Sequence, residues 1–564
     1  MVYMFRIVSC FIILQILTSF QLQSLQIDRH VIIVGGGVIG LLEAYQSWMA
    51  AVENEETVKI TVLEKNRKLS ATTACNIVPS LTPDEILSVV PRGEDLIDFL
   101  GLKFNEGSGI RVDDVEGIDE SSETVRHFIE SVVEYGRNEG AHKERTQVLL
   151  ELGKVSMELW QDFYDSADDT LKKLLTDANY NPCLEILKND NRLHQGYRID
   201  LLFHDSCAGS KALQMMESYQ KLGYASCRLL TPGEVVDIDP QLRSFVREYA
   251  CFDGEGESRW SENSAALWRP GGCLNTGEFI PKFVRYLTEL MTVDQNEGSE
   301  TCLFEIKFDH EVIGASFDHS SSITQLRVRN RAGNEYSFPD KEPDIPCDYI
   351  LAPGEGVGTL KTLGFQEPDY AVFAGPSLLL WVDLPKDKIK HYQQLDQCME
   401  VHQEGVVLAW QAKFRPSKVF IGVGGTKAFY GDKKPQINEE FAKDRNLLQL
   451  NAVNQVYWDL LSIALGKDTY HQALTQDDLD SLLIRGAAKT WVGSRGVAYD
   501  GFPTLGALYR GEERVNNARV TTHLGSGGVS FALGCIAISR ASLNDVKTID
   551  PLVEKVLDFS DSRR

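Results

Sequence analysis

Three glycines at fixed spacing are the first residues with a clear chemical use. In the stretch HVIIVGGGVIG, a run of β-branched residues breaks at Gly35, Gly37 and Gly40, which fill the pattern G-x-G-x-x-G. In a strand–turn–helix unit the first glycine permits the tight turn, the second lets a pyrophosphate approach the backbone, and the third lets helix and strand pack closely. The helix N-terminus that follows offers N–H groups and a positive dipole end to phosphates.

A carboxylate stands at the position where dinucleotide-binding units hydrogen-bond the ribose. Glu64, followed by Lys65, lies near the end of the next predicted strand, VKITVLEKN. A carboxylate there accepts hydrogen bonds from both ribose hydroxyls and repels a 2'-phosphate, which disfavours NADP. With Val38 and Ile39 at the helix start, these residues form the predicted dinucleotide-binding set. The alternative is a glycine turn that only joins a strand to a helix.

The elements that must position these residues begin with a β-α-β unit. It comprises a strand before Gly35, a helix from about Val38 to Val52 and a strand at 58–66. Beyond it, apolar spacings of three and four predict helices, and alternating stretches predict a second, largely antiparallel sheet. The helical regions are 122–190 and 437–465, and the strand-rich regions are 300–345 and 371–425. The tail repeats the opening order of strand, glycine-rich turn and apolar helix.

The segment after Glu64 separates FAD from NAD. KLSATTACNIVPSL contains small and hydroxyl residues in place of another helix–strand unit. From this point the sequence resembles the family of FAD-dependent amine and amino-acid oxidoreductases that includes D-amino acid oxidase and glycine oxidase. In that family a Ser/Thr-rich loop after the ribose-binding acid runs along the pyrophosphate and flavin. The resemblance assigns to this loop Ser70, Thr72, Thr73 and Asn76.

Further segments follow in the order of the family and extend the resemblance over nearly the whole chain after residue 26. They are LLTPGEVVDIDPQL, RPGGCLNTGEFIPKFVRYL, HEVIGASF, CDYILAPGEGVGTLKTLG, WVGSRGVAYDGFPTLG and THLGSGGVSFALG. The resemblance implies that Val312 meets the adenine through its backbone and that Ala352 and Gly354 lie near the dinucleotide. It assigns the closing flavin loop to Gly525, Ser526, Gly527 and Gly528.

Arg495 and His523 are the two candidate catalytic residues. Arg495 stands where the family holds an arginine over the flavin, which implies a grip on a substrate carboxylate; the alternative is a salt bridge with an acid such as Asp500. His523 precedes the closing loop, where it either influences the charge of reduced flavin or serves as a structural hydrogen-bonding residue. Two departures leave the substrate open. Gly496 replaces the usual proline, and THLGSGG lacks the basic residue found in some glycine and sarcosine oxidases.

The resemblance implies an α/β fold in which a Rossmann-like FAD-binding domain is interleaved with a substrate domain. The substrate domain is built on a largely antiparallel sheet, and a helical insertion is added. The expected FAD-binding portions are 29–110, 246–295, 346–366 and 489–550. The remaining portions are a signal peptide at 1–26, a helical and mixed region at 111–245, and the substrate domain at 296–345 and 367–488.

The implied activity is oxidation of a C–N bond in a small amine or amino acid by hydride transfer to FAD. Two alternatives remain, namely another flavoenzyme such as an FAD monooxygenase, and a non-catalytic binding or assembly protein with an FAD-type fold. The absence of H-E-x-x-H and C-x-x-C patterns predicts no metal site. A formal net charge of -24 opposes nucleic-acid binding and favours a small-molecule substrate. No oligomeric state follows from the sequence.

The N-terminus predicts a secretory signal. Arg6 precedes the apolar stretch 7–20, which is shorter than the about 20 residues of a bilayer-spanning helix. The alternatives are an uncleaved membrane anchor and a presequence of another kind. Cys10 lies in this stretch, and the other ten of the 11 cysteines fit either disulfides in an oxidising compartment or buried thiols. After cleavage we expect an exported protein with no stable membrane insertion.

We therefore expect residues 1–26 to be missing from the mature protein, because the fold begins only near Arg29. The measurement is N-terminal sequencing of protein purified from its native host. An intact Met1 on cytosolic protein would refute the signal, whereas an intact Met1 in the membrane fraction would favour the anchor.

Overall fold

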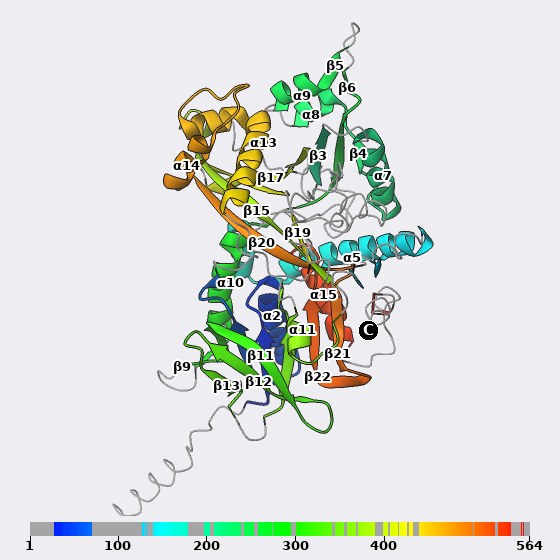
Figure 1. Ribbon diagram of the computed structural model, residues 1–564, viewed down its shortest axis with the longest axis vertical. Helices are drawn as coiled ribbons and strands as arrows, with labels where there is room; N and C mark the ends of the chain where they lie inside the picture. The colour runs from blue at the N-terminus through cyan, green and yellow to red at the C-terminus, as the bar shows by residue number, and fades with distance from the viewer. Residues whose placement is uncertain are drawn as a thin grey trace, which may run out of the picture.

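The computed structural model shows two sheets that together carry most of the strands (Figure 1). The residues that it describes are 27–69, 127–128, 130–131, 139–178, 197–203, 208–238, 242–252, 258–272, 274–294, 300–340, 345–354, 358–367, 370–389, 399–403, 406–415, 417–425, 428–431, 439–499, 501–524, 528–542, 554 and 556–557. The predicted signal at 1–26 lies outside them.

The first sheet is six-stranded and mostly parallel. Its order is β10-β2-β1-β14-β22-β21, and only the pair β21–β22 is antiparallel. The strands are β1 (Arg29–Val34), β2 (Val58–Glu64), β10 (Phe304–Phe308), β14 (Cys347–Leu351), β21 (Thr504–Arg510) and β22 (Glu513–Thr522). The helix α2 (Val38–Glu53) joins β1 to β2, which confirms the predicted β-α-β unit.

Both faces of this sheet are covered, as its apolar strands require. Val31 and Ile33 of β1 join one core cluster, and the alternate residues Ile32 and Val34 join another. The first cluster lies under the helices α2, α5 (Glu139–Ser166), α6 (Asp169–Asp177), α10 (Thr276–Leu290) and α15 (Ala532–Ala541). The second lies under β11 (His310–Phe317), β12 (Ile323–Asn330), β13 (Glu335–Phe338) and the short α11 (Thr359–Thr362).

The sequence had suggested that the strands between 300 and 340 join the large antiparallel sheet. This prediction is wrong, because they lie elsewhere in the fold. β10 pairs in parallel with β2, and β11, β12 and β13 form a three-stranded sheet of their own. Their alternating pattern fits this position, because Leu326 and Val328 are buried against the parallel sheet while intervening residues face outward.

The second sheet is nine-stranded and largely antiparallel, in agreement with the predicted fold class. Its order is β19-β15-β18-β17-β16-β3-β7-β4, with β20 pairing to β15. The strands are β3 (Tyr197–Phe203), β4 (Arg228–Leu229), β7 (Ser264–Pro270), β15 (Tyr370–Asp383), β16 (Met399–Gln403), β17 (Val406–Arg415), β18 (Lys418–Gly425), β19 (Ala428–Gly431) and β20 (Ala488–Ala498). Only β16 and β3 run parallel.

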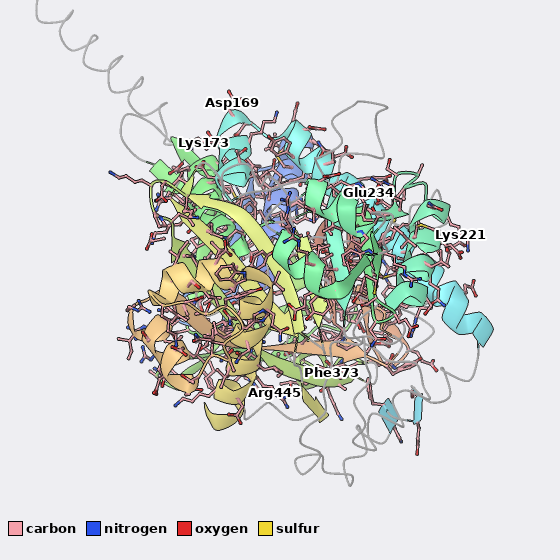
Figure 2. The ribbon with its side chains drawn as sticks, turned by 90° about the horizontal axis from the view of Figure 1, so that it is seen from above. Asp169, Lys173, Lys221, Glu234, Phe373 and Arg445 are labelled. Atoms are coloured by element: carbon pink, nitrogen blue, oxygen red, sulfur yellow. The ribbon has the colours of Figure 1, made fainter. Side chains whose placement is uncertain are left out.

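Helices cover parts of this second sheet. α13 (Glu439–Leu465), which carries Arg445 in Figure 2, packs on β15, and α14 (Gln476–Ile484) packs on α13. α7 (Ala208–Lys221) packs on β7. The remaining elements are α8 (Pro232–Ile238), α9 (Arg243–Tyr249) and the hairpins β5 (Ala250–Phe252) with β6 (Ser258–Trp260), and β8 (Thr292–Asp294) with β9 (Glu300–Cys302).

A buried ion pair joins the first helix of the parallel-sheet domain, α2, to its last strand, β22. Arg519 of β22 donates to Glu43 of α2 at 2.6 Å, and the Glu43 side chain is fully buried. A buried pair of this kind is costly to break, because the remaining charge is left uncompensated. Arg540 of α15 lies close by, and its pKa is lowered by burial and by the Arg519 charge. The C-terminal strand and helix are thereby fixed against the opening β-α-β unit.

Five cysteines in the described ranges are free thiols, namely Cys227, Cys251, Cys302, Cys347 and Cys535. Within the same ranges, no helix has the length and apolar character needed to cross a bilayer.

Candidate functional site

The predicted binding residues gather at one edge of the parallel sheet. β1, β2, β14 and β22 run in the same direction, so their carboxyl ends meet there. Gly35, Glu64, Ala352 and His523 each end or follow one of these strands. The edge where strand order changes direction is the usual ligand position in open α/β sheets.

The glycines of the turn are required by close backbone contacts. Gly35 has φ +107°, and a Cβ at this position would overlap the carbonyl oxygen of Ala352. A Cβ at Gly40 would overlap the carbonyl oxygen of Gly35. The strand, the turn and the first coil of α2 therefore fit together only when both residues lack side chains. These are the turn and packing roles that the sequence pattern predicts.

Gly37 differs from the other two glycines, because open space surrounds it. A Cβ there would meet nothing within 4 Å among the described residues. Gly37 is the N-cap of α2 and provides no side-chain cap, so the first-turn N–H groups, including those of Val38 and Ile39, have no partner within the helix. Space, unpaired N–H donors and a positive helix end together suit a phosphate or pyrophosphate.

Glu64 presents a buried carboxylate next to this space. One of its oxygens accepts from the backbone N–H of Gly36 at 2.7 Å, and the other accepts from the backbone and side chain of Asn66 at 2.8 and 2.6 Å. These bonds fix the direction of the carboxylate, which is only 4% exposed. The oxygen that accepts from Gly36 has a further lone pair for a hydroxyl donor. Lys65 beside it is exposed. The residues present therefore fit a dinucleotide.

Other predicted binding residues border the same edge. Ala352 is buried and its N–H donates to Val34 O at 2.9 Å, while Gly354 accepts from the Thr522 hydroxyl at 3.1 Å. Val312 of β11 is half-buried and packs against the cluster that contains the end of β1. Gly528 is described, with open space where a Cβ would lie. The remaining predicted residues, Ser70, Thr72, Thr73, Asn76, Gly525, Ser526 and Gly527, lie outside the described part of the chain.

His523 is enclosed at the point where the two large sheets meet. Its Nδ1 shares a hydrogen bond of 2.9 Å with the Thr504 hydroxyl, and Tyr370 stacks on its ring at 5.3 Å. Its Nε2 lies 3.6 Å from Oε1 of Glu367, a buried oxygen with no hydrogen-bond partner among the described residues. The residue is 3% exposed and has φ +56°. Such complete enclosure favours the structural alternative for this histidine.

The enclosure of His523 also explains why a glycine occupies position 496. A Cβ at Gly496 would lie 3.0 Å from Cδ2 of His523, closer than carbon atoms normally approach. The ring cannot move aside easily, because Tyr370 and Thr504 hold it. The departure from the family motif at Gly496 is therefore coupled to the histidine in the closing segment.

Arg495 lies on the other side of β20. Leu378 and Leu380 of β15 pack in the core that contains α13, and they pair with Thr490 and Ala488 of β20. Even-numbered residues of β20 therefore face α13, and Arg495 faces away from it. Arg495 is half-buried and pairs across the sheet with Phe373, labelled in Figure 2. The structure thus does not bring Arg495 and His523 to one face, and Asp500 lies outside the described residues.

β20 also connects the large sheet to the dinucleotide edge. Val497 forms an antiparallel bridge with Leu524, next to His523. Figure 1 shows β15 and β20 extending from the region of α13 and α14 down to the parallel sheet. Position 495 is therefore two residues along β20 from the bridge between Val497 and Leu524, within a portion of the chain that the sequence had placed in the FAD-binding domain.

Comparisons with known proteins identify the fold. No family model and no curated protein matches the chain. Among solved structures, the chain is similar to glycine oxidase from Bacillus cereus, with 14% identity and a TM-score of 0.50, covering 93% of this chain and 97% of that one. It is also similar to L-proline dehydrogenase from P. horikoshii, with 13% identity, coverage of 96% and 100%, and a TM-score of 0.48. The likeness to glycine oxidase supports the two-sheet α/β architecture.

Several residues that shape the site carry no sequence signal. Glu367, Tyr370 and Thr504 enclose His523, and Ser156 and Trp160 of α5 contact the segment after the closing loop. Most of these contacts join positions far apart in the chain; Thr504 and His523 are closer, because Thr504 pairs with Thr522, the residue before His523. Local pattern analysis could not identify these residues, because their roles arise only from tertiary packing.

We expect Gly496→Ala to lower the free energy of unfolding by about 1–3 kcal/mol, the scale of an overpacked core. The double variant with His523→Asn should recover most of this loss, since asparagine tolerates positive φ and has no imidazole ring. Urea denaturation measures the free energy of unfolding of the single and the double variant.

Gly209→Ala is the matched control, because a Cβ there meets nothing within 4 Å. A Gly496→Ala protein as stable as wild type would contradict the packing between Gly496 and His523.

Proposed function

We propose that this protein is an FAD-dependent oxidoreductase that oxidises a C–N bond of a small amine or amino acid. The observation that carries the proposal is the open space at Gly37, bounded by the N-terminus of α2 and the buried carboxylate of Glu64. Space for a phosphate beside a fixed acceptor for ribose hydroxyls is what a dinucleotide requires. The shared architecture with glycine oxidase supports the choice of reaction.

Support for FAD over NAD comes from two features. The segment after Glu64 resembles the Ser/Thr-rich loop of FAD-dependent amine oxidoreductases. The large antiparallel sheet, joined to the dinucleotide edge through Val497 and Leu524, supplies a second domain against that edge. When bound, FAD supplies an acceptor for the hydride of the substrate's C–H bond.

The residues of the chain then have positioning roles. The α2 N-terminus and Gly37 hold the pyrophosphate, and Glu64 holds the ribose. Arg495 offers a planar pair of donors that matches a carboxylate, which orients the C–N bond of an amino acid. Placing the reacting atoms in this way can supply a large share of the rate enhancement.

The test is anaerobic substrate screening of the purified protein. The wild type should be yellow, release FAD on denaturation, and lose its flavin absorbance when amines or amino acids are added without oxygen. Gly37→Val should remain folded, since its side chain meets open space, but should lose FAD because the pyrophosphate position is filled.

Three other outcomes would refute parts of the proposal. Protein that binds no FAD even after reconstitution would exclude a flavoenzyme. FAD without bleaching by any amine would favour a non-catalytic protein. Oxygen consumption driven by NADH or NADPH would indicate a monooxygenase.

We expect Arg495→Lys to retain FAD but to lose roughly 2–4 kcal/mol of transition-state binding for carboxylated substrates, on the scale of lost charged hydrogen bonds. Amines without a carboxylate should lose little. The measurement is kcat/KM for matched substrates with and without the carboxylate. An equal loss for both, or a lower Tm alone, would identify Arg495 as structural.

A further inference from the structure

Helix α5 makes side-chain hydrogen bonds to a backbone segment far along the chain. The Trp160 indole Nε1 donates to the carbonyl oxygen of Val529 at 3.0 Å. The Ser156 hydroxyl donates to the carbonyl oxygen of Ser530 at 2.7 Å and accepts from the N–H of Gly534 at 3.1 Å. One face of α5 is therefore hydrogen-bonded to the segment before α15 and to the first turn of α15 itself.

These three bonds lie in a dry environment. Ser156 and Ser530 are 0% and 1% exposed, and Trp160 and Val529 are 1% and 3% exposed. A buried carbonyl that loses its donor keeps the full cost of desolvation. Ser156 and Trp160 are four residues apart, so they project from the same face of α5. The contact is close, because a Cβ at Gly534 would lie 3.0 Å from the Ser156 Cβ.

The segment bound by α5, residues 529–531, borders the dinucleotide edge. It follows Gly528, and Leu524 shortly before it bridges Val497 of β20. Val529 and Phe531 belong to the same buried cluster as Val38 and Ile39, the first residues of α2. The segment therefore contacts α5 and leads into α15, which packs on both α5 and α2, the helix that would receive the pyrophosphate.

α5 reaches the second domain as well. Leu150 packs in a separate buried cluster with Tyr219 and Tyr224, at and beyond the end of α7, and with Leu267 of β7. The same helix thus contacts the nine-stranded sheet region and the segment at the dinucleotide edge. The predicted helical insertion therefore includes a helix, α5, that links the two domains.

We propose that Ser156 and Trp160 are positioning residues that hold Val529 and Ser530 in the conformation required for FAD binding. This inference rests on the proposed function. With both carbonyl groups fixed, the turn after Gly528 enters α15 in one orientation, and binding need not order it. Without either donor, part of the binding free energy is consumed in ordering the segment.

The experiment compares four single variants. Ser156→Ala removes one donor with little change of volume, and Trp160→Phe removes the other together with part of the buried ring. Ser539→Ala and Trp260→Phe are controls for the same substitutions outside residues 529–534. Ser539→Ala removes a buried serine bond to Val520 O further along α15, and Trp260→Phe removes a half-buried indole bond to Leu230 O. Two quantities are measured, the Kd for FAD by flavin fluorescence and the hydrogen-exchange rates of amides 529–534 without FAD.

Ser156→Ala and Trp160→Phe should each raise the Kd for FAD about tenfold, the equivalent of one buried hydrogen bond. Both should speed exchange at 529–534, and the two controls should change neither quantity. Donor variants that match the controls in Kd and exchange would overturn the inference. If wild-type protein binds no FAD, the proposed function fails. Faster exchange in the donor variants would then still show that α5 orders residues 529–534, and only the link of this ordering to FAD binding would be overturned.

Discussion

The close approach of backbone to backbone at the end of β1 is the constraint on which the site depends. Gly35 abuts the carbonyl of Ala352 at the end of β14, and Gly40 abuts the carbonyl of Gly35. Because no side chain fits at either position, β1, β14 and α2 are held in one arrangement. That arrangement leaves the space at Gly37 open and points the helix N-terminus into it. The buried pair of Glu43 and Arg519 then fixes the C-terminal strand against α2.

The second sheet meets this edge through a small number of contacts. Val497 bridges Leu524, and His523 fills the space left by Gly496. On the opposite face of β20, Arg495 is kept away from α13 and from His523. Strand alternation therefore separates the residue suited to a carboxylate from the residue that joins the two sheets.

The sequence was sufficient for the opening turn, because the roles of Gly35 and Gly40 depend on local geometry that a short pattern encodes. It was also sufficient for the fold class, through the order of the segments that resemble the family. It was also sufficient for α2 and most of α13, whose limits follow periodicity. It was insufficient for β10–β13 and β20, since strand alternation does not specify which sheet a strand joins. It could not reveal the partners of His523, nor the contact of α5 with residues 529–534, because these contacts connect distant parts of the chain.

The proposed activity depends on whether the open space at Gly37 binds a dinucleotide. The most direct measurement is a crystal structure of the protein grown with FAD. We expect density for the pyrophosphate over Gly37 and the N-terminus of α2, with a ribose hydroxyl on Glu64. Density for FAD elsewhere in the molecule, or an empty space at Gly37 at saturating FAD, would contradict this expectation.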